Sequence, residues 1–226
     1  VGSEMCIRDR HHPIYIWSFF FGLIVASSVL VAKEIKHWHI GTVISLIAGG
    51  CIAYVITVMS PAETPNTWWF IILSGAIAIC AMILPGISGA FILLLMGKYS
   101  YILGAVSSLN IGVMLLFIVG AVAGIISFSH LLSWLLKKHH TATVATLTGF
   151  MVGSLNKVWP WKETLETYTD SHGVVRPLVE ANVSPHYFQE LTQSDPLLVE
   201  AIVMCIVGFV LIYGIEFIGK KMQKQQ

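Results

Sequence analysis

The sequence is too apolar for an ordinary soluble domain. Of its 226 residues, 56% are hydrophobic and 11% are charged, whereas soluble domains carry about 25% charged residues. A mean hydropathy of +0.78 and several uncharged runs of about 20 residues predict an all-α protein that crosses a membrane several times. The net charge of +1, without a basic stripe, offers no surface for nucleic acid.

The first ten residues do not share this apolar pattern. They are polar, they lack any period, and they resemble translated cloning or adapter sequence. We therefore exclude residues 1–10 from the expected fold and treat residues 11–226 as one membrane domain. Under this interpretation, an N-terminal part of the natural protein is missing.

Five uncharged or nearly uncharged runs are predicted to span the membrane. They are Ile14–Ala32, Ile40–Met59, Ile111–Leu136, Thr141–Val158 and Leu197–Gly219. The third and fourth contain small-residue patterns, Gly120-x-x-x-Gly124 and Gly149-x-x-x-Gly153, which are typical of close helix contacts in membranes. A polar segment, residues 159–195, separates the last two spans.

Between the second and third spans, the apolar run Trp68–Gly97 is broken by Leu84-Pro85-Gly86-Ile87-Ser88-Gly89. Proline removes a backbone donor and clashes with the preceding helical turn, and glycine permits sharp bends. Non-helical backbone at membrane depth is tolerated only where it is buried in protein or lines a cavity. The pattern predicts a functional break, and a proline kink packed on a neighbouring helix is the alternative.

The distribution of basic residues predicts how residues 68–97 lie in the membrane. If residues 68–97 enter and leave the membrane on one face, the basic residues of the chain divide seven to four between the two sides. If residues 68–97 cross the membrane, the basic residues divide six to five. The larger asymmetry agrees with the positive-inside rule. We expect five spanning helices and one re-entrant hairpin, with residues 159–195 external and the C-terminus cytoplasmic. The cytoplasmic set is Lys33, Lys36, Lys137, Lys138, Lys220, Lys221 and Lys224, and the opposite set is Lys98, Lys157, Lys162 and Arg176.

A helix that begins inside the membrane after the break presents free backbone N–H groups and its positive dipole end to an anion. Ser88 adds a hydroxyl donor, and Gly86 and Gly89 let an anion approach the backbone closely. Discontinuous helices form the substrate sites of many transporters. The residues alone therefore indicate an anion site, while a packing kink stays open.

Two segments, Met82–Tyr99 and Gly153-Ser154-Leu155-Asn156-Lys157-Val158-Trp159-Pro160-Trp161-Lys162, resemble signatures of the polyprenyl-phosphate transporter family, long catalogued as a domain of unknown function. The resemblance implies transport of undecaprenyl phosphate across the bacterial inner membrane, by alternating access, without catalysis or a cofactor. Family members carry an earlier Pro-Gly-Val-Ser-Gly-Gly-Thr-like copy of the motif, absent here. The resemblance therefore implies the second half of an inverted-repeat transporter.

The resemblance also assigns candidate substrate contacts. In the first motif they are Pro85, Gly86, Ser88, Gly89, Lys98 and Tyr99, and in the second they are Asn156 and Lys157. Lys98 either meets the phosphate or extends to the membrane interface. Trp159 and Trp161 are expected to be interface anchors.

His130 is the ionisable residue within the Ile111–Leu136 run, and it either relays a proton or donates a hydrogen bond to a neighbouring helix. A coupling ion, H⁺ or Na⁺, is compatible with transport, but no residue pattern identifies it, and the oligomeric state is not indicated. We expect Cys51, Cys80 and Cys205 to be buried thiols, with no disulfide framework and no metal site.

Two other function classes stay open. Undecaprenyl-diphosphate phosphatases use a similar Pro-Gly-x-Ser motif, but with arginine where this chain has Gly89. Phosphoryl transfer needs positive charge or metal at the transferred group, and none of the predicted spans contains arginine. The third class is a structural membrane protein in which the break is a packing kink.

Overall fold

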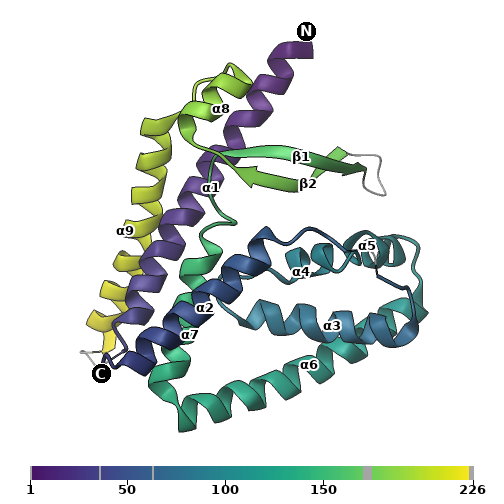
Figure 1. The fold of residues 1–226 in the computed structure, drawn as a ribbon, viewed down its shortest axis with the longest axis vertical. Coiled ribbons are helices and arrows are strands. Elements are labelled where there is room, and N and C mark those ends of the chain that lie inside the picture. Colours follow the sequence, from purple (N-terminus) through teal and green to yellow (C-terminus); the bar gives the residue numbers. More distant parts are fainter. Residues whose placement is uncertain (1, 36, 63, 170–174, 224–226) are drawn as a thin grey trace.

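The computed structural model describes residues 2–35, 37–62, 64–169 and 175–223 (Figure 1). In chain order, its elements are α1 (Gly2–Ala32), α2 (Ile40–Val58), α3 (Trp68–Ile83), α4 (Gly89–Leu95), α5 (Tyr99–Ser107), α6 (Ile111–Lys138), α7 (His140–Ser154), β1 (Lys162–Thr169), β2 (Val175–Asn182), α8 (Pro185–Thr192) and α9 (Leu198–Gln223). Helix α1 thus continues through residues 2–10, which we had excluded from the fold on composition.

The structure confirms a helical, multi-pass membrane architecture. Within the described ranges, four segments are long and apolar enough to cross a bilayer: Ile14–Ala32, Ile40–Val58, Ile111–Lys138 and Leu198–Lys221. They match four of the five predicted spans. At the fifth, α7 has 15 residues, which is short of the roughly 20 that cross a bilayer.

The helices pack as three close pairs, α1 with α9, α2 with α7, and α3 with α6. Both predicted small-residue patterns lie at these contacts. A Cβ at Gly120 would lie 1.9 Å from the Ile72 carbonyl oxygen, and one at Gly149 would lie 2.1 Å from the Leu46 carbonyl oxygen. Only glycine permits this backbone approach.

The predicted break is present, and it turns the chain back on itself. Helix α3 ends at Ile83, and α4 begins at Gly89 and packs against α3. The far end of α4 meets the loop that precedes α3, since the Ala62 amide donates to the Leu95 carbonyl over 2.8 Å. The start of α3 and the end of α4 therefore lie side by side, as the two ends of a re-entrant hairpin must. Helix α5, bent by 110° from α4, was not predicted.

The basic helix ends gather at one end of the molecule. Lys33 Nζ, just beyond α1, donates to the Tyr213 hydroxyl of α9 over 3.3 Å, and Ile35 packs in one apolar cluster with Leu136 of α6 and Val144 of α7. Figure 1 shows the C-terminus at this end, and the two strands and α8 at the other.

The polar segment is folded rather than a plain loop. Strands β1 and β2 pair antiparallel, from Lys162 opposite Asn182 to Thr169 opposite Val175. The indole N–H groups of Trp159 and Trp161 donate to the Val183 and Pro196 carbonyls, each over 2.9 Å. Trp161 also packs with Ile14, Phe188 and Ala201 in a buried cluster. The two tryptophans therefore fix the polar segment to α1 and α9.

One expectation about the cysteines is wrong. Cys51 is exposed, because it lies on the outward side of the crossing between α2 and α7, in an apolar depression with Tyr54, Val55 and Val152. Cys80 and Cys205 are partly buried.

Candidate functional site

The tip of the hairpin is shaped by Gly86. Its φ is +89°, a conformation that residues with a side chain rarely adopt. A Cβ at this position would lie 2.3 Å from the Ser154 hydroxyl oxygen. Ser154 is fully buried and donates to the Met151 carbonyl over 2.8 Å at the end of α7. The hairpin tip is therefore seated directly on the end of α7.

Ser88 and Gly89 begin the returning arm. Gly89 is buried, and a Cβ there would lie 2.6 Å from the Ala78 carbonyl oxygen of α3. Ser88 precedes the helix in an extended conformation, is exposed, and makes no capping hydrogen bond with its side chain. Its hydroxyl is thus available beside the tip, although α4 itself spans seven residues.

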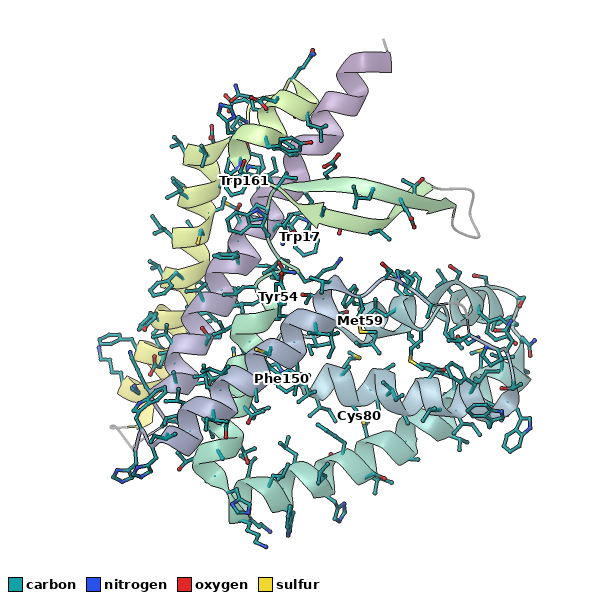
Figure 2. All side chains as sticks on the ribbon, in the orientation of Figure 1. Trp17, Tyr54, Met59, Cys80, Phe150 and Trp161 are labelled. Carbon is teal, nitrogen blue, oxygen red and sulfur yellow. The ribbon has the colours of Figure 1, made fainter. Side chains whose placement is uncertain are left out.

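A cavity of about 230 Å³ brings the two sequence motifs together. The hairpin contributes Gly86, Ser88 and Phe91, and the segment after α7 contributes Lys157. The remaining lining residues are Trp17, Ile56, Thr57, Ile87 and Val158. Figure 2 shows Trp17, in this view, between strands β1 and β2 and the part of α2 that carries Tyr54. Ser88 and Lys157, both predicted substrate contacts, therefore line one space.

Lys157 also borders a second cavity, of about 360 Å³, which shares Thr57 and Phe91 with the first. The Lys157 ammonium lies 4.6 Å from the centre of the Phe91 ring and 3.2 Å from Glu180 Oε2 of β2. The side chain keeps 30% of its surface exposed. Its charge therefore lies on the wall of both cavities.

Lys162 is the second cation of this cluster, and it is more firmly fixed. Its ammonium lies 3.3 Å from Glu180 Oε2, donates to the Lys157 carbonyl over 2.8 Å, and lies 4.2 Å from the centre of the Trp17 ring. Burial lowers the pKa of Lys162 from its ordinary value, and Glu180 opposes the shift. Burial also acts to raise the pKa of Glu180, but the two lysines outweigh it and hold this pKa below its ordinary value.

Asn156, a predicted contact, lies beside this cluster. Its amide donates to the Thr57 hydroxyl over 2.9 Å, and the Asn182 amide donates to the Asn156 backbone carbonyl over 2.6 Å. Asn156 borders the larger cavity. These hydrogen bonds join the ends of α2, α7 and β2, and so hold the walls of the site in register.

Lys98 is placed elsewhere. It is fully buried, and its ammonium donates to the Thr64 carbonyl over 2.7 Å and to Asn66 Oδ1 over 2.5 Å. The rings of Phe70 and Tyr101 lie 5.3 and 5.7 Å away. Lys98 thus ties the end of α4 to the loop before α3. It lines neither cavity, and nor does Tyr99, which begins α5.

His130 is exposed on α6, and its Nδ1 lies 3.0 Å from the Ile126 carbonyl oxygen. This partner is one turn earlier on the same helix, so the contact is not the interhelical bond considered above. In the described part of the chain, no three His, Cys, Asp or Glu side chains gather in a group that could hold a metal ion.

Sequence reasoning missed four residues of this region: Trp17, Thr57, Lys162 and Glu180. Lys162 closes the second motif, so its place at the site had a signal. Glu180 had none, since it is one of several acidic residues in a polar segment whose strand pairing the sequence did not reveal.

Comparisons with known proteins agree with the two motifs. The family model described as "Undecaprenyl phosphate translocase-like" matches residues 5–176. A "Polyprenyl-phosphate transporter" of Vibrio cholerae is 46% identical over 210 residues, 93% of this chain and 68% of that protein. A Staphylococcus aureus protein of the same name is 32% identical over 68% of this chain and 60% of its own length. No solved structure matches. The chain therefore belongs to the undecaprenyl phosphate translocase-like family.

Proposed function

We propose that this protein moves a polyprenyl phosphate, such as undecaprenyl phosphate, across the membrane, with the phosphate bound between the hairpin tip and Lys157. The observation that carries the proposal is the cavity lined by both Ser88 and Lys157. The names of its relatives point to the same lipid class. The chain spans 68% and 60% of those relatives, so the activity of the whole protein is part of the proposal.

The chemistry of the cavity suits a phosphate monoester. Such a group carries about −1.5 to −2 charge at pH 7 and accepts several hydrogen bonds. Lys157 supplies a cation, and the Ser88 hydroxyl supplies a donor beside it. Phe91, Ile56 and Ile87 surround these groups with apolar surface, where a charge-assisted hydrogen bond is stronger than in water. The isoprenoid tail stays in the lipid beside the helices.

A lipid phosphatase fits this site less well. That family's motif has arginine directly after the serine, and here the position is Gly89. A side chain at this position would begin 2.6 Å from the Ala78 carbonyl oxygen, so the backbone of α3 would have to move to admit one. The described lining of the two cavities thus offers binding groups for a phosphate and includes no guanidinium to stabilise phosphoryl transfer.

Reconstituted protein tests the proposal. The purified chain is placed in liposomes that contain a fluorescent polyprenyl phosphate, and dithionite quenching reports how fast the lipid changes leaflet. We expect the wild type to speed this exchange, Lys157→Gln to slow it by about tenfold or more, and Ser88→Ala to slow it by roughly tenfold, as loss of a hydrogen bond to a charged group predicts.

Matched controls are Lys137→Gln, on an exposed lysine at the opposite end, and Ser107→Ala, on an exposed serine of α5. Both should behave as wild type. Unchanged exchange in Lys157→Gln and Ser88→Ala would disprove phosphate binding at this cavity. Release of inorganic phosphate from undecaprenyl diphosphate by the purified protein would favour the phosphatase instead.

The orientation is also proposed: the basic end, with Lys33, Lys138 and the C-terminus, faces the cytoplasm of a bacterial inner membrane. The clustering of these basic helix ends supports it, because the positive-inside rule favours lysine on the cytoplasmic side. Alkaline phosphatase fused after Gln226 should be inactive in whole cells. An active fusion would reverse the orientation.

A further inference from the structure

The two lysines and one carboxylate at the site form a cluster with a net charge of +1. Glu180 Oε2 lies 3.2 Å from Lys157 Nζ and 3.3 Å from Lys162 Nζ. The side chains of Lys162 and Glu180 keep 8% and 21% of their surface exposed, so both charges are only partly screened by water. Lys162 is also held by the Lys157 carbonyl and the Trp17 ring, whereas the Lys157 side chain keeps 30% of its surface exposed, so Lys157 is the cation more accessible to a ligand.

Glu180 is placed to oppose any further negative charge at this point. The two lysines keep its pKa below the ordinary carboxyl value, so it is ionised at neutral pH. It borders the larger cavity together with Lys157. Glu163 of β1 lines a neighbouring cavity with Glu180 and Lys162 and has the same sign. An anion that binds Lys157 therefore meets a net charge of +1 with a carboxylate beside it.

We propose that Glu180 determines the headgroup charge accepted at this site, so that a lipid monophosphate binds in preference to a lipid diphosphate. The inference rests on the proposed function. A monophosphate brings about −1.5 to −2 charge to the net +1 of the cluster, so only a small negative excess remains while Glu180 stays ionised. A diphosphate brings additional negative charge to a place where the nearest carboxylate is fixed by two lysines and cannot turn away without leaving them unpaired.

The expected size of the effect follows from Coulomb's law. Two like unit charges roughly 6 Å apart, at an effective dielectric constant of about 20, correspond to a change in Kd of about a hundredfold. Partial exposure of Glu180 reduces this, so we expect its charge to account for about a tenfold preference. Glu180→Gln keeps the shape and a hydrogen-bonding oxygen but removes the charge.

Binding of farnesyl phosphate and farnesyl diphosphate, which share one tail, tests the inference. Titrations of purified protein in detergent are followed by tryptophan fluorescence, since Trp17 lines the cavity that holds Ser88. In Glu180→Gln, both probes should bind more tightly, and the ratio of the two Kd values should shift about tenfold toward the diphosphate. Glu166→Gln, on an exposed carboxylate of β1, is the matched control and should leave the ratio unchanged.

A second variant keeps the test decisive if Glu180→Gln fails to fold. Thr164 is exposed and pairs with Glu180 across the strands, so Thr164→Glu adds a carboxylate on the same face. It should shift the ratio further toward the monophosphate. If the wild type binds the monophosphate but neither variant moves the ratio, the inference fails while the proposed function stands. If the wild type binds neither probe, the proposed function fails, and the inference with it.

Discussion

Lys98 should stabilise the hairpin rather than bind the headgroup, and Lys98→Met separates these roles. The variant is one atom shorter and keeps most of the apolar surface of the side chain, but it removes both hydrogen bonds to the loop before α3, at Thr64 and Asn66. That loop has two further described ties to the end of α4, from the Ala62 amide to the Leu95 carbonyl and from the Thr64 hydroxyl to the Met96 carbonyl. The ammonium therefore supplies two of the four hydrogen bonds at the junction of the two hairpin arms.

The magnitude follows from these two contacts. A hydrogen bond to a charged group contributes about 1.5–3 kcal/mol, so the pair contributes about 3–6 kcal/mol. Methionine avoids the cost of burying an ammonium, and the loop carbonyls can return to water. We expect the free energy of unfolding to fall by about 2–4 kcal/mol, a loss of about 4–16 °C in melting temperature for a chain of this size.

The assay is thermal unfolding in detergent, together with titration of farnesyl phosphate. Lys98→Met should melt earlier and, below its melting temperature, bind the probe as wild type does. Asn66→Ala should lose about half as much stability, and Lys137→Met, on an exposed lysine, should lose none. An unchanged melting temperature with weakened probe binding would refute the structural role and place Lys98 at the phosphate.

Three further changes test the packing and electrostatics of the site. Gly86→Ala should lower the free energy of unfolding by about 2–4 kcal/mol, since it adds positive-φ strain and a steric clash with Ser154. Ser154→Gly in the same chain should restore part of this loss. If the two substitutions instead change the free energy of unfolding additively, the contact would be excluded. In Gly153→Leu, the new Cβ would lie 2.3 Å from the Gly50 carbonyl oxygen, so the variant should lose its monodisperse peak in size-exclusion chromatography. Gly104→Leu, with open space around the new side chain, should keep the peak. Equal behaviour of the two variants would contradict the close α2–α7 crossing. Because the pKa of Glu180 is lowered in the fold, the stability that its ion pairs contribute should be complete above the ordinary carboxyl range and lost as pH falls through the lowered pKa. The melting temperatures of wild type and Glu180→Gln should therefore differ at pH 7 and converge only in acid. A difference that stays constant with pH would argue against the ion pairs.

Much of the helical architecture could be predicted because membrane spans are a local property of sequence. A helix of about 20 apolar residues matches the thickness of the bilayer core, so α1, α2, α6 and α9 could be predicted from hydropathy. The break at Pro85 and Gly86 was equally local. Helix α7 was predicted too long, because hydropathy continues to Val158 while the helix ends at Ser154, where Gly86 packs against it.

The composition of the site was harder to predict, because it depends on pairings distant in sequence. The two motifs supplied Ser88 and Lys157 as candidate substrate contacts, and both line one cavity, but nothing in the sequence placed Glu180 beside Lys157. That contact needs the register of β1 on β2, in strands whose apolar alternation is weak. Lys98 shows the converse: it closes the first motif in sequence, yet its hydrogen bonds go to a loop.

The hairpin tip and the end of α7 are best understood together. A hairpin turning at residues 84–88 leaves backbone groups without helical partners, and so does a helix that ends at Ser154. Inside a membrane each would be costly alone. Here Gly86 sits directly on Ser154, so the two interruptions meet and enclose a cavity with a serine, a lysine and apolar walls. The break is therefore a joint between the re-entrant hairpin and the end of α7, and the cavity takes residues from both sides of that joint.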